Sequence, residues 1–67
     1  MKITVFNERE QTTNIVNFAG ATVLEFLHFL KINPETVIVT RNNEVILEAK
    51  LLQDNDIIEL LSVISGG

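Results

Sequence analysis

Residues 23–32 are the one clear amphipathic helix in this sequence, and this feature constrains the fold more than any other. The apolar residues of this stretch recur at the three- and four-residue spacing that places them on one face of a helix: Val23, Phe26, Leu27 and Leu30. A single helix buries one apolar stripe, so it must lie across one face of a sheet built from the rest of the chain.

Both ends of this helix carry boundary signals. Thr22 and Glu25 match the S/T-x-x-E capping box, in which the threonine hydroxyl accepts from the third helical amide while the glutamate reaches back. At the other end, Asn33 followed by Pro34 is expected to stop the helix. Lys31 is then expected in the last turn, where a positive charge favours the helix dipole.

The remaining apolar segments are short and rich in β-branched residues, as strands are. The predicted strands cover residues 2–6, 12–18, 36–41, 44–47 and 57–64. The first two form a hairpin, and Asn42–Asn43 is the turn between the third and the fourth because Asn tolerates positive φ. Residues 48–53 are expected to form a connection with one helical turn. The last strand is nearly all apolar, so it is expected in the middle of the sheet, beside the first.

The predicted fold class is therefore α+β, with a mixed sheet of four to five strands and one main helix packed on one face. Residues 1–64 are expected to form one domain, and residues 65–67 a flexible C-terminal tail. With 67 residues, of which 46% are hydrophobic, the chain can form a single core. We expect a monomer when the protein is free.

Charge and composition exclude several classes of function. The net charge of −4 disfavours nucleic acids and anionic membranes, which bind basic surfaces. The chain has no cysteine and one histidine, His28, so neither a metal site nor a nucleophilic catalytic set is expected. We expect no bound cofactor and no enzymatic activity of the chain by itself. Strand-like residues directly after Met1 argue against a signal peptide, and the apolar runs are too short to cross a bilayer, which predicts a cytoplasmic protein.

The chain ends in Ser65, Gly66 and Gly67, directly after the last predicted strand. Two interpretations are open. Domain ends are often simply frayed. Alternatively, residues without side chains can thread a narrow channel, and three extended residues can carry the terminal carboxylate roughly 10 Å from the sheet into the active site of another protein.

Over essentially its whole length, the chain resembles the ThiS/MoaD family of ubiquitin-like sulfur carriers. The resemblance rests on the hairpin, the helix "ATVLEFLHFL", the strand–turn–strand "INPETVIVTRNNEVI", the segment "LQDNDIIEL" and the terminal "SVISGG". It implies a β-grasp fold. The short chain looks more like the ThiS branch than the longer MoaD branch, but the residues just before the two glycines are diagnostic of neither.

The resemblance also implies a mechanism. An E1-like enzyme of the ThiF/MoeB type would use MgATP to adenylate the Gly67 carboxylate, with Gly66 as its flexible lead, and a sulfur donor would convert the acyl-adenylate into a thiocarboxylate. A sulfur-accepting synthase would then receive the sulfur, for the thiazole of thiamine in the ThiS branch. Other outcomes stay open: delivery to molybdopterin, delivery to tRNA, and conjugation of Gly67 to proteins as a ubiquitin-like modifier.

Docking of such a partner is expected at the root of the tail. Alternation along the last strand predicts Ile58 and Leu60 in the core and Leu61 and Val63 on the opposite face, with Ile38 beside them. We expect Ile38, Leu61 and Val63 to form an exposed apolar patch, with Ser65 as the exit toward the partner. The alternative is that these are ordinary exposed aliphatic residues, and a shift of the register by one residue would exchange the two faces.

Overall fold

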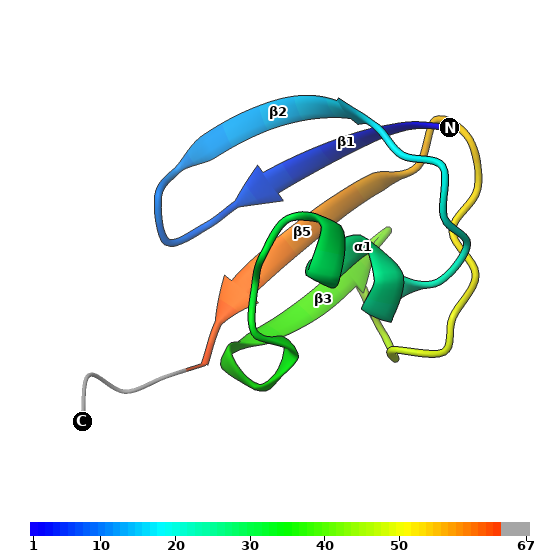
Figure 1. Ribbon diagram of the computed structural model, residues 1–67. Helices are drawn as coiled ribbons and strands as arrows, with labels where there is room; N and C mark the ends of the chain where they lie inside the picture. Colours follow the sequence, from blue (N-terminus) through cyan, green and yellow to red (C-terminus); the bar gives the residue numbers. More distant parts are fainter. Residues whose placement is uncertain (64–67) are drawn as a thin grey trace.

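The structure is a computed structural model that describes residues 1–63 as one five-stranded sheet with one α-helix (Figure 1). The elements along the chain are β1 (Lys2–Asn7), β2 (Thr12–Asn17), α1 (Val23–Phe29), the 3₁₀-helix η1 (Pro34–Thr36), β3 (Val37–Arg41), β4 (Glu44–Ile46) and β5 (Ile57–Ser62). All predicted strands are present, with ends that differ by a few residues at most. Ile64 and the predicted tail, residues 65–67, lie outside the described residues.

The strand order in the sheet is β2-β1-β5-β3-β4, so the last strand lies in the centre, as predicted. It runs parallel to β1 and antiparallel to β3, which makes the sheet mixed. The prediction of a β5 position beside the first strand is therefore confirmed. Burial on the helix side explains the apolar sequence of this strand, because Ile58 and Leu60 are 0% and 1% exposed.

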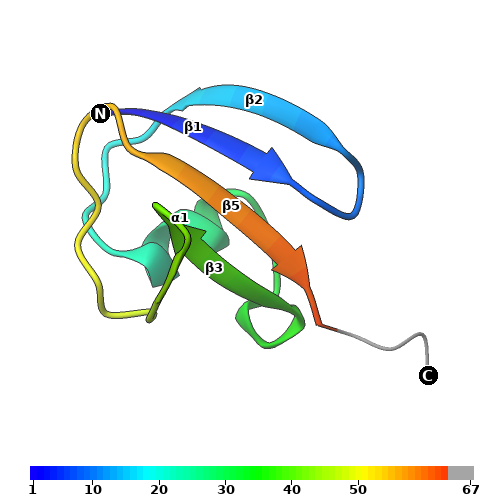
Figure 2. The same ribbon diagram turned by 180° about the vertical axis from the view of Figure 1, so that it is seen from behind.

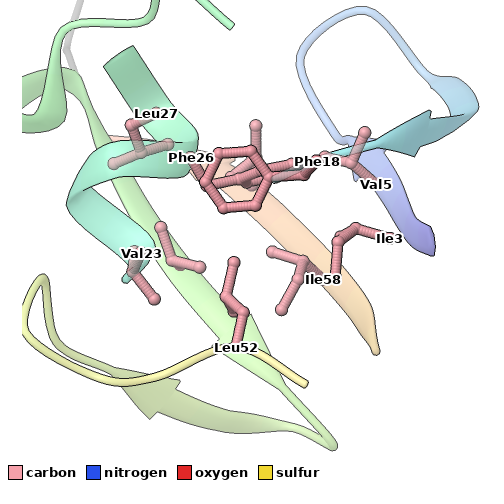
Figure 3. Close-up of a cluster of buried hydrophobic side chains, with 10 residues drawn as sticks. Ile3, Val5, Phe18, Val23, Phe26, Leu27, Leu52 and Ile58 are labelled. Carbon is pink, nitrogen blue, oxygen red and sulfur yellow. The ribbon is translucent and has the colours of Figure 1, made fainter. Parts of the chain in front are cut away.

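The core lies between α1 and one face of the sheet (Figure 3). The rings of Phe18 and Phe26 meet edge to face with their centroids 5.0 Å apart, which is a favoured aromatic arrangement. The helix contributes three of the buried core residues, and the sheet and loops contribute the others. The core consists of Ile3, Val5, Phe18, Val23, Phe26, Leu27, Val39, Leu52, Ile58 and Leu60. The predicted stripe of the helix is thus in the core, with Leu30 packed against its edge.

The predicted end of the helix is wrong by three residues, because α1 ends at Phe29 rather than at Ile32. Lys31 has a φ of 61°, and its N–H donates to the carbonyl of His28, while the N–H of Ile32 donates to the carbonyl of Leu27. This pair of hydrogen bonds is a Schellman motif, which closes a helix and usually has glycine where this chain has Lys31. Lys31 therefore lies beyond the last turn and not within it.

Asn33 and Pro34 begin a new element instead of ending the helix. The Asn33 side chain accepts a hydrogen bond from the N–H of Glu35 at 2.9 Å and caps η1, in which Pro34 is the first residue. Proline suits this position because its missing N–H would have no partner in the first helical turn. The third strand consequently starts at Val37, one residue later than predicted.

The expected helical turn within residues 48–53 is present only as a tight turn at Glu48 and Ala49, in which the N–H of Lys50 donates to the carbonyl of Leu47 at 3.0 Å, and no helix forms there. The segment packs against the start of α1. The N–H of Val23 donates to the carbonyl of Lys50, and the N–H of Leu24 donates to the carbonyl of Glu48, both at 3.0 Å. These carbonyls satisfy amides that the first turn of a helix leaves without partners. Leu52, at 6% exposure, anchors the segment in the core.

The predicted capping box at the start of α1 is confirmed. The Thr22 hydroxyl accepts from the N–H of Glu25 at 3.2 Å, and the Glu25 carboxylate accepts from the N–H groups of Thr22 and Ala21 at 3.0 Å each. Hydrogen bonds from backbone amides stabilise the ionised carboxylate, so the donations from Thr22 and then Ala21 lower the pKa of Glu25 below its ordinary value.

This capping box makes the stability of the fold depend on pH in a defined direction. A carboxyl whose pKa is lower in the folded state stabilises the fold above its unfolded pKa and loses that contribution as the pH falls through the folded pKa. Glu25→Gln is therefore expected to lower the free energy of unfolding at neutral pH, and to match the native chain once Glu25 is fully protonated. Urea unfolding of both chains across this pH range measures the difference. An equal deficit at every pH would contradict it.

Candidate functional site

Figure 2 shows the face of the sheet that α1 leaves open. At the end of the central strand this face carries exposed apolar side chains. In the register between β3 and β5, Ile38 lies directly opposite Leu61. Val63 follows on the same side two residues later, and its N–H donates to the carbonyl of Thr36 at 3.1 Å. Ile38 and Val63 are 39% and 45% exposed, and Leu61 is half-buried. We call Ile38, Leu61 and Val63 the tail-root patch.

The predicted orientation of these strands is confirmed. Ile58, Leu60 and Val39 are buried on the helix side, and Val37 packs against the same core. Since side chains alternate along a strand, the residues between them point to the open face. The structure therefore brings the three predicted residues of the tail-root patch together. That the patch binds a partner stays a prediction.

The open face carries further apolar residues beyond the three predicted ones. Phe6 lies opposite Glu59, and Val45 lies opposite Thr40, so these residues share the face with the tail-root patch. Ile57, at the start of β5, is 66% exposed on the same face. The signal for these residues was the alternation within each strand, but placing them together also requires the register between strands, which the sequence alone does not supply.

The centre of the open face carries two polar side chains that are hydrogen-bonded to each other. Thr40 is buried at 7% exposure, and its hydroxyl donates to the Glu59 carboxylate at 3.2 Å. Within residues 1–63, every buried side-chain nitrogen or oxygen atom has a hydrogen-bond partner. The face thus presents apolar side chains around one polar pair that is already hydrogen-bonded within the sheet.

The central strand holds the root of the tail rigidly. β5 is hydrogen-bonded to β1 on one side and to β3 on the other. In addition, the carbonyl of Leu60 accepts from the N–H of Glu8 at 3.0 Å. Val63 is the last described residue, so the predicted reactive residues Gly66 and Gly67, and Ser65 before them, lie outside the described part. Whatever follows Val63 is attached to a strand that is paired on both sides.

Chemical machinery is sparse in the described part of the chain. Residues 1–63 contain no group of three or more His, Asp or Glu side chains that could hold a metal ion. His28 is exposed on the outer side of α1, away from the open face. Among these same residues, no helix is long and apolar enough to cross a membrane.

Comparison with known proteins gives three matches. The model of the ThiS family matches residues 3–67. The sulfur carrier protein TtuB of Thermus thermophilus is 42% identical over 43 residues, which make up 64% of this chain and 66% of that protein, just under two thirds of its length. The crystal structure of the thiamine biosynthesis protein ThiS from Geobacter metallireducens matches with a TM-score of 0.69 and 32% identity, over 100% of both chains.

Proposed function

The chain belongs to the ThiS family, and on this basis we propose that it is a sulfur carrier whose reactive group is the carboxylate of Gly67. The observation that carries the proposal is the extent of the family match, which runs through both terminal glycines to residue 67. The sulfur carrier function of the relative TtuB supports it. The relevant chemistry needs a carboxylate that another protein can reach, held on a rigid support.

The proposed reaction activates a poor electrophile. The Gly67 carboxylate attacks the α-phosphorus of ATP and displaces pyrophosphate, which gives an acyl-adenylate. A persulfide-type sulfur donor attacks the acyl carbon, the carbon–oxygen bond to AMP breaks, and reduction of the remaining sulfur–sulfur bond by a thiol leaves the thiocarboxylate. MgATP and the catalytic residues belong to an E1-like enzyme of the ThiF/MoeB type, so this chain needs no cofactor of its own and acts as a carrier and not as an enzyme.

The tail-root patch is the proposed docking site for that enzyme. Ile38 and Leu61 lie side by side across two paired strands, and Val63 stands two residues before the tail. Covering these side chains would remove apolar surface from water, which favours association. Three extended residues, 65–67, would then reach roughly 10 Å into the active site while the folded body stays outside. Ser65 would be the first residue of this arm to meet the enzyme.

The proposed acceptor is the synthase that forms the thiazole of thiamine, in the cytoplasm. The support is the match with ThiS of Geobacter metallireducens over the full length of both chains. A carrier for another acceptor, such as molybdopterin or tRNA, is the second candidate, because the higher identity of 42% is to TtuB, whose name specifies no thiamine role. Conjugation of Gly67 to proteins would use the same activated carboxylate.

A deletion of the gene in the native host separates these acceptors. The deletion strain is expected to require thiazole for growth, and an added thiazole alcohol should restore growth fully. Expression of the chain from a plasmid should restore it as well. Growth without thiazole, combined with loss of molybdopterin or of thiolated tRNA, would assign the carrier to another acceptor and leave the tail chemistry intact.

A further inference from the structure

One edge of the sheet is long and uncharged, and it carries backbone groups without partners in the sheet. β2 forms this edge with six residues, whereas the opposite edge, β4, has only three. No charged residue occurs between Glu10 and Glu25, although charged residues make up 21% of the chain. Proteins usually protect an edge strand with charges, proline or a bulge, because its free N–H and carbonyl groups can pair with another strand.

The hydrogen bonds between β1 and β2 show which residues of β2 direct their N–H and carbonyl groups toward the free edge of the sheet. The N–H of Phe18 donates to the carbonyl of Met1 at 2.8 Å, and the Met1 amino group donates back to Phe18, so this pair exchanges both hydrogen bonds. On β1, the N–H of Thr4 donates away from β2, to the carbonyl of Asp56 at 2.9 Å. Bonded and non-bonded pairs alternate in an antiparallel ladder, and Thr4 lies opposite Ile15. The residues of β2 whose backbone N–H and carbonyl groups point to the free edge are therefore Thr13, Ile15 and Asn17, and we call them outward-facing.

This set of outward-facing residues is complementary to itself. When a second copy of β2 approaches antiparallel with Ile15 opposite Ile15, Thr13 lies opposite Asn17 at both ends. Every outward-facing residue then pairs with another outward-facing residue and can exchange both hydrogen bonds. The register also places an apolar side chain against an apolar one and a polar side chain against a polar one, and brings no like charges together.

We propose that two copies of this chain associate through their β2 strands, related by a two-fold axis at Ile15, into one continuous ten-stranded sheet. Ile15 is 66% exposed in the single chain, and the association covers it. The contact is small, and contacts burying less than ~1,200 Å² typically form weak complexes, so a dissociation constant on the order of 0.1 mM is expected. This association replaces the monomer expected from the sequence, which does not reveal which strand lies at the edge.

The association is independent of the proposed sulfur chemistry. β1 separates β2 from β5, and the tail-root patch lies farther along the sheet, on β5 and β3. Both tails and both patches stay accessible in the dimer. A monomeric chain would overturn the dimer without affecting the role of Gly67, and loss of the role of Gly67 would leave the dimer intact.

Sedimentation velocity of the full chain tests the association directly. The native chain is expected to shift from monomer to dimer between roughly 0.01 and 1 mM. Ile15→Pro removes an N–H that faces outward, so it removes no hydrogen bond within the monomer, and it should raise the dissociation constant at least tenfold. A native chain that stays monomeric to 1 mM would overturn the proposal. The β2 edge would then pair with a strand of another protein or stay unpaired.

A disulfide cross-link tests the register of the two β2 strands. The native chain has no cysteine, so only the introduced thiols can form it. Ile15→Cys places two thiols opposite each other with Cα atoms about 5.5 Å apart, within the range of a disulfide. Ile57→Cys is the matched control, because Ile57 has the same 66% exposure on the same face but lies in the central strand. Under mild oxidation, Ile15→Cys should form the disulfide dimer at least tenfold faster. Equal rates in two chains with native circular dichroism would contradict the register.

Discussion

Deletion of Gly67 is expected to abolish ATP–pyrophosphate exchange by the activating enzyme in the presence of this chain, with a loss of at least about 1,000-fold. The shortened chain still ends in a glycine carboxylate, that of Gly66. However, one residue fewer withdraws the carboxylate by roughly 3.5 Å, and a displacement of only ~1 Å can cost ~100-fold in rate. The rate of exchange with labelled pyrophosphate measures this effect.

Two further chains separate the reach of the tail from its chemistry. A chain with a carboxamide in place of the Gly67 carboxylate keeps the length of the tail but has no nucleophilic carboxylate, and it should be as inactive as the deletion. His28→Ala alters an exposed residue on the outer side of α1 and should exchange like the native chain. Exchange within about tenfold of native for the Gly67 deletion would refute the role given to this residue.

The substitution Leu61→Asp is expected to weaken binding of the activating enzyme about 100-fold, the effect of losing a central apolar contact. A carboxylate in the middle of the tail-root patch would lose its hydration on docking, with no opposite charge among Ile38 and Val63 to compensate. The fold should persist, because Leu61 lies half-buried on the open face and not in the core. Calorimetric titration with the enzyme measures the affinity.

Ile57→Asp is the matched control for this substitution. Ile57 lies on the same strand and the same face, and it is four residues, or about 13 Å, away from Leu61. It should retain enzyme binding within a few-fold while carrying the same added charge. If the two variants lose affinity equally, the contact is not centred on the tail-root patch, and if neither loses it, the patch is not the docking site. Urea unfolding of both variants establishes that each is folded.

The helix illustrates what local pattern can and cannot predict. The apolar spacing of Val23, Phe26 and Leu27 and the Thr22–Glu25 capping box are short-range features, and both are present as predicted. The end of α1 depends instead on Lys31, which adopts a left-handed conformation. This conformation is uncommon for lysine, so the residue type does not predict it. Asn33–Pro34, which resembles a stop signal, caps η1.

Long-range pairing accounts for the rest. The nearly continuous apolar sequence of β5 predicted a central strand, and the alternation of side chains along a strand predicted which of its residues point inward. The path of residues 48–53 depends on amides of α1 that only the folded chain brings near, such as that of Val23. In the candidate site, alternation predicted Ile38, Leu61 and Val63 on the open face, while Phe6 and Val45 joined them through registers that no local pattern encodes. Gly67 lies beyond the described residues, so its proposed role rests on the family match.

The mass of the intact chain isolated from its native host tests the central claim most directly. The account predicts a species heavier than the unmodified chain by the exchange of one oxygen for one sulfur, with fragmentation placing the difference at Gly67. The species should disappear when the activating enzyme is deleted. A chain recovered only unmodified, under conditions in which the pathway is active, would contradict the assignment as a sulfur carrier, and higher-mass conjugates dependent on Gly67 would identify a protein modifier instead.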